Sequence, residues 1–213
     1  MGLIAAPATV LCSRAAAALG IIRNTFAKFG LPINLAPGKT EVLLGLHGKG
    51  SKAVRSEVYL EKAGRLRVPL AEGDEVVVVT DSYKHLGSMI SSDTHMTAEV
   101  SYRIKSLWAA VRPIARNFYK SDRFDPAVKQ LTLQPLLLSR LLFNSPTWNV
   151  LCSADAKRLN GAFLRVLHLV YGTAKHDFED PLVHRRVLVR AGLPSLEDLM
   201  RVQRLNFLPR LLA

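Results

Sequence analysis

The chain has 213 residues, of which 49% are hydrophobic, so it is long and apolar enough to fold around one or two cores and is not a disordered chain. It has only two cysteines, Cys12 and Cys152, and no CxxC pair, which excludes a disulfide scaffold and a zinc-finger spacing. The net charge of +12 favours an anionic partner, nucleic acid or a membrane surface, with a generic basic protein as the alternative.

The positive charge is densest in the middle of the chain. Residues 96–140 carry 8 Lys or Arg against 3 Asp or Glu, whereas residues 1–95 carry 11 against 8. We therefore expect a phosphate-contacting face in residues 96–140. No apolar run approaches the roughly 20 residues of a membrane span, so a membrane partner is not expected.

The first 30 residues predict a short strand and then a helix. Gly2–Ala6 is an apolar run, Pro7 suits the start of a helix, and helical periodicity continues to Phe29. Gly30 is the expected C-cap. The apolar side of this helix is expected to be Val10, Ala17, Ile21 and Phe29, widened by Leu11, Ala18, Ile22 and Phe26.

Strand patterns follow as far as residue 90. We expect strands at Glu41–Leu46, Arg65–Leu70, Glu75–Thr80 and Tyr83–Ile90. Glu72-Gly73-Asp74 predicts that the second and third form a hairpin. Residues 51–62 fit either a short helix capped by Ser51 or a hairpin arm.

From about Asp93 the pattern is helical. The expected helix starts are Asp93 or Thr94, Asp125, Ser153, Asp180 and Ser195. The first of these helices has an apolar stripe: Val100, Ile104, Leu107, Val111, Ile114 and Phe118. Its opposite face carries Ser101, Lys105, Arg112, Arg116 and Lys120, and Pro113 should kink or split it. The predicted fold class is α+β, with a strand-rich part at 1–92 and an all-helical part at 93–213.

Two glycine motifs resemble nucleotide-binding loops but fail on context. Gly38-Lys39-Thr40 would need a glycine where Ile33 stands, and it leads into a strand rather than a helix, so an NTPase loop is rejected. Gly48-Lys49-Gly50-Ser51-Lys52-Ala53 fits a relaxed dinucleotide fingerprint but has no apolar helix face. No other catalytic constellation stands out, and no small-molecule cofactor is expected.

An ordered set of motifs resembles the reverse transcriptases of non-LTR (LINE-type) retrotransposons. Phe29-Gly30-Leu31-Pro32-Ile33-Asn34 with Lys39-Thr40-Glu41 is similar to their "GL.IN..KTE" signature, and Tyr83–Ser88 to their "YLG" signature. Glu99, Arg103-Ile104, Lys129, Leu141-Leu142-Phe143 and Thr147-Trp148 follow in the family's order.

The resemblance implies a partial palm, made of a helix and short antiparallel strands, followed by an all-helical region like the family's thumb. Gly30, Asn34 and Lys39 would belong to motif D beside the nucleotide site, with Lys39 as an auxiliary group near the triphosphate or as a plain turn lysine. Tyr83 and Gly87 would belong to the primer grip. Lys105, Arg112, Arg116 and Lys120 would contact the backbone of an RNA/DNA template–primer.

The chain departs from the family at the catalytic centre. The intact enzymes hold Mg²⁺ with a Y-x-D-D box and an earlier aspartate, and no acidic residue precedes Glu41 here. We therefore expect the chain to begin just after that box, to lack the fingers and most of the palm, to hold no metal of its own, and to be inactive alone as a polymerase.

Two other interpretations stay open. The chain could be a host-used interaction module that kept the polymerase fold and lost the enzyme. It could also be a nuclear or organellar basic protein that binds nucleic acid or a partner without any link to polymerisation. Residues before Glu41 are free of acids and include Arg14, Arg23 and Lys28, as in a mitochondrial transit peptide. A nuclear or cytoplasmic location is expected, with mitochondrial targeting as the alternative.

Overall fold

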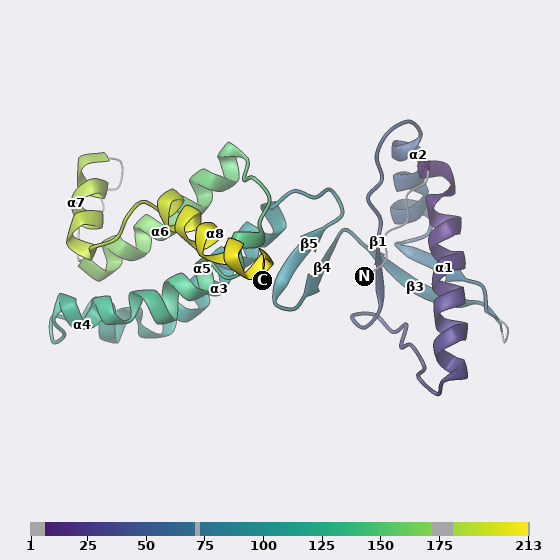
Figure 1. The fold of residues 1–213 in the computed structure, drawn as a ribbon, viewed down its shortest axis with the longest axis horizontal. Coiled ribbons are helices and arrows are strands. Elements are labelled where there is room, and N and C mark those ends of the chain that lie inside the picture. Colours follow the sequence, from purple (N-terminus) through teal and green to yellow (C-terminus); the bar gives the residue numbers. More distant parts are fainter. Residues whose placement is uncertain (1–6, 71–72, 172–180, 213) are drawn as a thin grey trace. The chain divides into compact units, whose positions relative to one another are not determined.

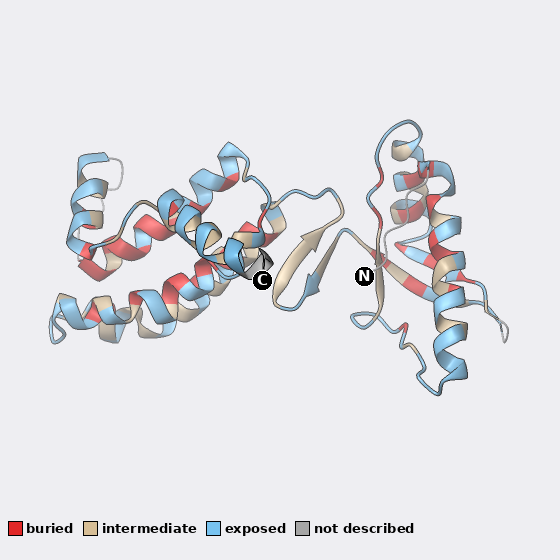
Figure 2. Cartoon of the chain, in the orientation of Figure 1, coloured by how far each residue is buried: buried red, intermediate tan, exposed pale blue. Residues whose placement is uncertain are grey.

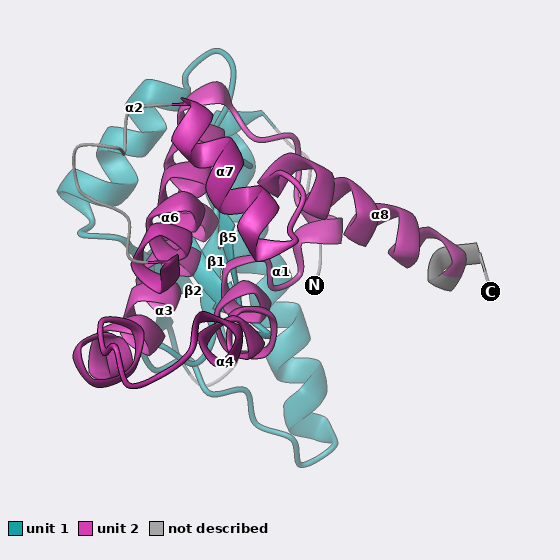
Figure 3. Ribbon diagram, turned by 90° about the vertical axis from the view of Figure 1, so that its left-hand side faces the viewer, with its two compact units in different colours: residues 1–95 teal, residues 96–213 magenta. Residues whose placement is uncertain are grey.

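The computed structural model describes residues 7–70, 73–171 and 181–212. The chain is of the α+β class and divides into two compact units, Met1–His95 and Met96–Ala213 (Figure 3). The strand expected at Gly2–Ala6, the helix start at Asp180 and the turn residue Glu72 lie outside the described residues.

Unit 1 is built on a helix and a small sheet (Figure 1). Its elements are α1 (Ala8–Lys28), β1 (Glu41–Leu43), α2 (Ser51–Ser56) continued as a π-helical turn η1 (Glu57–Glu61), β2 (Arg65–Val68), β3 (Glu75–Thr80), β4 (Ser82–His85) and β5 (Ser88–Ser91). Residues 51–61 are thus helical, and Gly50 rather than Ser51 stands at the N-cap.

Strand β3 lies in the centre of the three-stranded sheet, which has the order β1-β3-β2. The predicted hairpin is confirmed, because β2 pairs antiparallel with β3 from Arg65 opposite Val78 to Val68 opposite Glu75. The expectation of short antiparallel strands holds for the pairs β2–β3 and β4–β5 but is wrong for β1, which pairs parallel with β3. The intervening α2–η1 helix and β2 return the chain so that β3 runs in the direction of β1.

Helix α1 ends where the sequence predicts but buries a different face. Gly30 has φ +71°, and the amides of Gly30 and Leu31 donate to the carbonyls of Ala27 and Phe26, which is a Schellman motif. The buried residues of α1 are small ones plus a single leucine: Ala8, Leu11, Ala15, Ala16 and Gly20.

Close packing explains this choice of face. A Cβ on Gly20 would lie 2.6 Å from the carbonyl oxygen of Pro69, so the helix approaches the end of β2 too closely for larger side chains. The expected apolar stripe is therefore largely exposed, with Ile21 67% and Phe29 76% accessible. Figure 2 shows the buried side of α1 turned toward the strands.

Residues 82–91 form a hairpin rather than the single predicted strand. Tyr83 of β4 pairs with Ile90 of β5, and His85 pairs with Ser88. Leu86 and Gly87 make the turn with φ values of +47° and +86°, the left-handed conformation that two-residue hairpin turns require.

Unit 2 contains helices and connecting loops, and no strand, in the part that the structure describes. Its elements are α3 (Thr97–Ile114), the π turn η2 (Ala115–Tyr119), α4 (Pro126–Leu131), the π turn η3 (Leu133–Leu138), α5 (Ser139–Leu141), the 3₁₀ turn η4 (Ser145–Thr147), α6 (Ser153–Tyr171), α7 (Pro181–Ala191) and α8 (Leu196–Leu212). The core includes Leu107, Val111, Leu137, Leu141, Phe163 and Leu167, each at most 1% exposed.

Local signals explain some helix ends in unit 2 and not others. The predicted caps at Asp125 and Ser195 are confirmed, since their side chains accept from the amides of Ala127 and Asp198. The prediction for Asp93 is wrong, because α3 starts only at Thr97 and the Asp93 carboxylate accepts from the amide of His95 in the preceding turn. Ser153 is the first residue of α6 and not its cap.

Candidate nucleic-acid interface

One face of α3 and the adjoining η2 turn is basic. Lys105, Arg112 and Arg116 are all exposed, and at 3.6 residues per turn they lie within an arc of about 40°. At 1.5 Å per residue they cover about 16 Å of the helix axis. Lys120, also exposed, follows directly after η2. We call Lys105, Arg112, Arg116 and Lys120 the basic row.

The basic row keeps its positive charge because its own helix offers no exposed carboxylate. Glu99 is the only acidic residue between Thr97 and Tyr119, and it is buried. The described side chains opposite the row, Val100, Leu107 and Val111, are at most 1% exposed, so core packing fixes the rotation of α3 and turns the row toward solvent.

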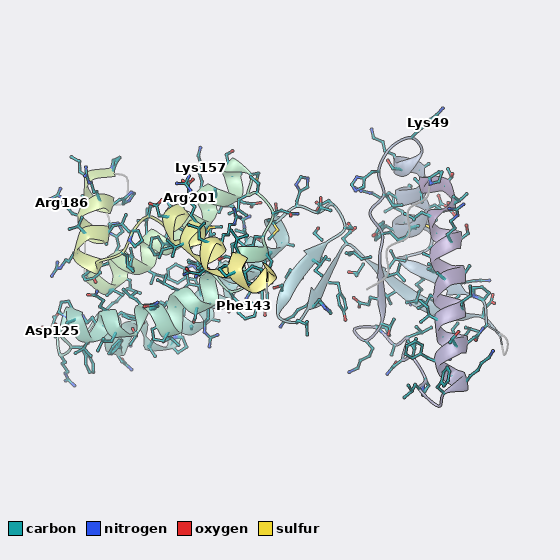
Figure 4. The ribbon with its side chains drawn as sticks, in the orientation of Figure 1. Lys49, Asp125, Phe143, Lys157, Arg186 and Arg201 are labelled. Atoms are coloured by element: carbon teal, nitrogen blue, oxygen red, sulfur yellow. The ribbon has the colours of Figure 1, made fainter. Side chains whose placement is uncertain are left out.

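Glu99 is neutralised inside the unit by Arg103. Arg103 Nε donates to Glu99 Oε1 at 2.7 Å, and the guanidinium lies 4.6 Å from the ring centroid of Phe143, which is labelled in Figure 4. Both residues belong to the motif set quoted above. The structure places them in the core, where they position α3 against the segment that follows α5.

The first turn of α3 contacts α6 through a hydrogen bond to a buried carboxylate. Asp155 accepts from Thr97 Oγ1 at 2.7 Å and from Arg158 Nη1 at 3.1 Å. Burial alone would raise the pKa of Asp155, but hydrogen bonds from Thr97, Cys152 and Arg158 outweigh it and lower that pKa. The α3–α6 junction is therefore stabilised by an ionised aspartate.

Arg158 adds a basic residue that no pattern in the sequence indicates. Its Nη2 donates to Ser101 Oγ at 2.8 Å, and Ser101 stands one helical turn before Lys105 on the same face. The Arg158 side chain is 47% exposed. Arg158 thus extends the basic row beyond its N-terminal end, through a contact between residues 57 positions apart that no local pattern reveals.

The stretch from Gly30 to Glu41 is a sequence of tight turns. Asn34 Oδ1 accepts from the amide of Ala36, and the amide of Gly38 donates to Glu41 Oε1. The first bond gives Asn34 a structural role in this turn, and Gly30 has a structural role in the Schellman motif that ends α1. Lys39 is exposed in this turn, and its role as an auxiliary group stays a prediction.

The hairpin β4–β5 holds both residues of the predicted primer grip. Tyr83 is half-buried on β4, with its ring centroid 6.4 Å from that of His85, and Gly87 is in the turn. Leu86 beside Gly87 is 85% exposed at the tip. The structure therefore groups Lys105, Arg112 and Arg116 on one face of unit 2, whereas Tyr83, Gly87 and Lys39 belong to unit 1.

The described residues contain neither a metal-binding cluster nor a membrane-spanning helix. No cluster of three or more His, Cys, Asp or Glu side chains is arranged to hold a metal ion in residues 7–70, 73–171 and 181–212. Within the same ranges, no helix is both long and apolar enough to cross a membrane.

The comparisons with known proteins found no relative of this chain. No protein-family model, no curated protein and no solved structure matches the chain. The interpretation of the basic row therefore depends on its own geometry and on the quoted motifs.

Proposed function

We propose that unit 2 binds the sugar–phosphate backbone of a nucleic-acid duplex through the basic row, and that the chain is the end-of-palm and thumb part of a non-LTR retrotransposon reverse transcriptase. The observation that carries the binding proposal is the exposed alignment of Lys105, Arg112 and Arg116 with no acidic side chain on that face of α3. The ordered motifs support the family proposal.

The spacing of the basic row suits a phosphate backbone better than a point ligand. Three cations spread over about 16 Å of one helix can each meet a different phosphate. Contacts of this kind fix the position of a duplex without reading its sequence. Unit 2 as a whole carries 18 Lys or Arg against 9 Asp or Glu, which would also steer an anionic duplex toward it.

The same reasoning predicts no polymerase activity from these 213 residues alone. The Mg²⁺ ions of the family are held by paired aspartates, and the sequence has no Asp-Asp pair. The residues present do not fit that metal centre, so no catalytic step is assigned to them. Magnesium-dependent primer extension by the purified chain would contradict this part of the proposal.

The binding proposal is tested with a blunt RNA–DNA hybrid and fluorescence anisotropy. Replacing Lys105, Arg112 and Arg116 by alanine should weaken binding by about 30-fold or more at low salt, because three phosphate contacts are lost. A matched control replaces Arg165, Arg185 and Arg186, which are exposed on α6 and α7, so that the net charge falls equally. Equal weakening in both variants, or no binding by the unmodified chain, would reject the basic row as the interface.

A further inference from the structure

The last turns of helix α1 carry an apolar surface that unit 1 leaves in solvent. All the buried residues of α1 lie between Ala8 and Gly20, and each residue from Ile21 to Lys28 is at least partly exposed. Figure 2 shows these turns largely in pale blue. The large apolar side chains exposed there and just after the helix are Ile21 (67%), Ile22 (44%), Phe26 (47%), Phe29 (76%) and Leu31 (59%). We call these five residues the α1 patch.

The α1 patch continues the side of the helix that is buried nearer its start. Ile22, Phe26 and Phe29 have the spacing i, i+4, i+7, and by helical period they share one face with Leu11 and Ala15, which are buried. One side of α1 is therefore part of the core at the start of the helix and open to solvent at its end. A contiguous apolar surface of this kind marks an interaction site more often than isolated apolar residues do.

The α1 patch is large enough to form an interface between two copies of the chain. With about 180 Å² for a fully exposed side chain of this size, the exposed fractions of its five residues amount to about 500 Å². The largest apolar patch on a typical monomer covers roughly 300–600 Å² and is often functional. Two copies that cover this surface for one another would remove about 1,000 Å² from water, the area at which specific interfaces begin.

The polar groups beside the α1 patch do not oppose its burial. Thr25 Oγ1 donates to the carbonyl oxygen of Ile21 at 2.8 Å, so the hydroxyl can be covered without losing its partner. Arg23 is ion-paired with the first residue of β3. Lys28 lies at the edge of the apolar face by helical period, where its long side chain can keep the ammonium group in water.

We infer that the α1 patch is a two-fold interface with a second copy of this chain, in which the two α1 helices pack antiparallel and meet near Phe26. The stripe of Ile22, Phe26 and Phe29 is symmetric about Phe26 to within one residue. In this register, Ile22 of each copy meets Phe29 of the other, and the two Phe26 rings meet across the axis, as a two-fold contact requires. No charged residue shares that stripe, so pairing brings no like charges together. This self-complementarity favours a second copy as the occupant, independently of duplex binding by unit 2.

The experiment measures the oligomeric state of the full chain by sedimentation velocity. Concentrations run from about 1 to 200 μM, and about 0.5 M salt suppresses bridging by residual nucleic acid. The test variants are Ile22→Glu and Phe29→Lys, which change exposed positions and introduce residues that suit a helix and its C-terminal end. Leu60→Glu is the matched control, since Leu60 is 79% exposed on η1 of the same unit and is not part of the α1 patch. Circular dichroism checks that all three variants keep their helix content.

The unmodified chain and Leu60→Glu should dimerise with a Kd of about 10 μM, as befits an interface at the lower end of the size range. Ile22→Glu and Phe29→Lys should each weaken the dimer by about 30-fold or more, because two unpaired charges would be buried in every pair. An equimolar mixture of Ile22→Glu and Phe29→Lys should restore dimers to within about tenfold of the unmodified chain. In the mixed pair the two substituted positions meet once with opposite charges, and the second contact between these positions stays apolar.

Three outcomes would overturn the inference. The first is an unmodified chain that stays monomeric at the highest concentration, or a loss of dimer in Leu60→Glu as large as in Ile22→Glu. The second is a mixture of Ile22→Glu and Phe29→Lys that stays monomeric, which would reject the antiparallel pairing. The third is a monomeric chain that binds phosphatidylcholine–phosphatidylserine vesicles and loses this binding in Ile22→Glu, which would assign the α1 patch to a lipid surface. Duplex binding by the basic row is measured separately, so its failure would leave this test unaffected.

Discussion

Arg103 Nε donates to Glu99 Oε1 across 2.7 Å, with only 5% and 1% of the two side chains exposed. Because the Arg103 guanidinium also lies over the ring of Phe143, the pair joins α3 to the segment after α5. The ion pair thereby removes the only carboxylate of α3 and η2 from the surface that carries the basic row.

Arg103→Met should lower the free energy of unfolding of unit 2 by about 3 kcal/mol, because it leaves the Glu99 carboxylate buried without its partner. Both tryptophans of the chain, Trp108 and Trp148, belong to unit 2. Urea unfolding followed by tryptophan fluorescence therefore reports on the affected unit.

An exposed ion pair provides the control for Arg103. The side chains of Arg201 and Glu197 are 65% and 74% exposed, so Arg201→Met should change the same free energy by less than about 0.5 kcal/mol. Adding Glu99→Gln to Arg103→Met should recover part of the loss. Similar effects of Arg103→Met and Arg201→Met would show that burial of the pair is unimportant.

Asp155→Asn should destabilise unit 2 at neutral pH by about 2 kcal/mol, since an ionised acceptor of several hydrogen bonds is lost. The pKa of Asp155 is lowered in the folded chain, whereas the unfolded value is about 3.9. Its contribution is therefore present above about pH 4 and is lost as the pH falls through the lowered folded pKa. The difference between unmodified and variant chains should shrink over that acid range. A difference that stays constant from neutral pH into strong acid would contradict this assignment.

Two glycine-to-alanine changes should have opposite effects on stability. Gly30 has φ +71°, so Gly30→Ala should destabilise the end of α1 by about 1 kcal/mol through backbone strain alone, as no atom lies within 4 Å of the added Cβ. Gly161 is inside α6 with the same free space, and Gly161→Ala should stabilise that helix by roughly 0.5–1 kcal/mol. Hydrogen exchange of the α1 amides tests the first change, and fluorescence-monitored unfolding tests the second. If both changes altered stability in the same direction, the positive φ of Gly30 would not determine the effect of Gly30→Ala.

Features determined by neighbours in sequence could be predicted. The Schellman end at Gly30 and the caps at Asp125 and Ser195 depend on a few consecutive residues, and each matches its prediction. The basic row was also predictable, because it is the complement of an apolar stripe with helical period.

Features determined by packing could not be predicted. The buried face of α1 is chosen by the close approach of Gly20 to Pro69, which no hydrophobic pattern encodes. The turn at Leu86-Gly87 lacks the usual Asn-Gly or Asp-Gly signal, so the sequence pattern predicts one strand where the structure has a hairpin. The Arg158–Ser101 contact joins residues 57 positions apart in the chain.

The Tyr59 phenol should lose its proton at a higher pH than a free tyrosine. Burial, followed by the neighbouring Asp81 carboxylate, raises the pKa of Tyr59 to about 12, against about 10 in an unfolded chain. Because the folded value is raised, its contribution to stability is present below about pH 10 and is lost as the pH rises toward 12. The difference between the tyrosinate absorbance titrations of the unmodified chain and Tyr59→Phe should have its midpoint near 12. A midpoint near 10 would show that the phenol is solvated.

Each residue of the basic row should contribute to the salt dependence of duplex binding. Neutralising one phosphate changes the slope of log K against log salt by about 0.9 for double-stranded DNA, so Arg112→Ala should flatten the slope by about that amount on duplexes of different sequence alike. Arg186→Ala, an exposed arginine on α7, should leave it unchanged. If Arg112→Ala weakened binding with an unaltered slope, the contact would not be ionic; if it weakened binding to one sequence only, Arg112 would contact a base edge rather than the backbone.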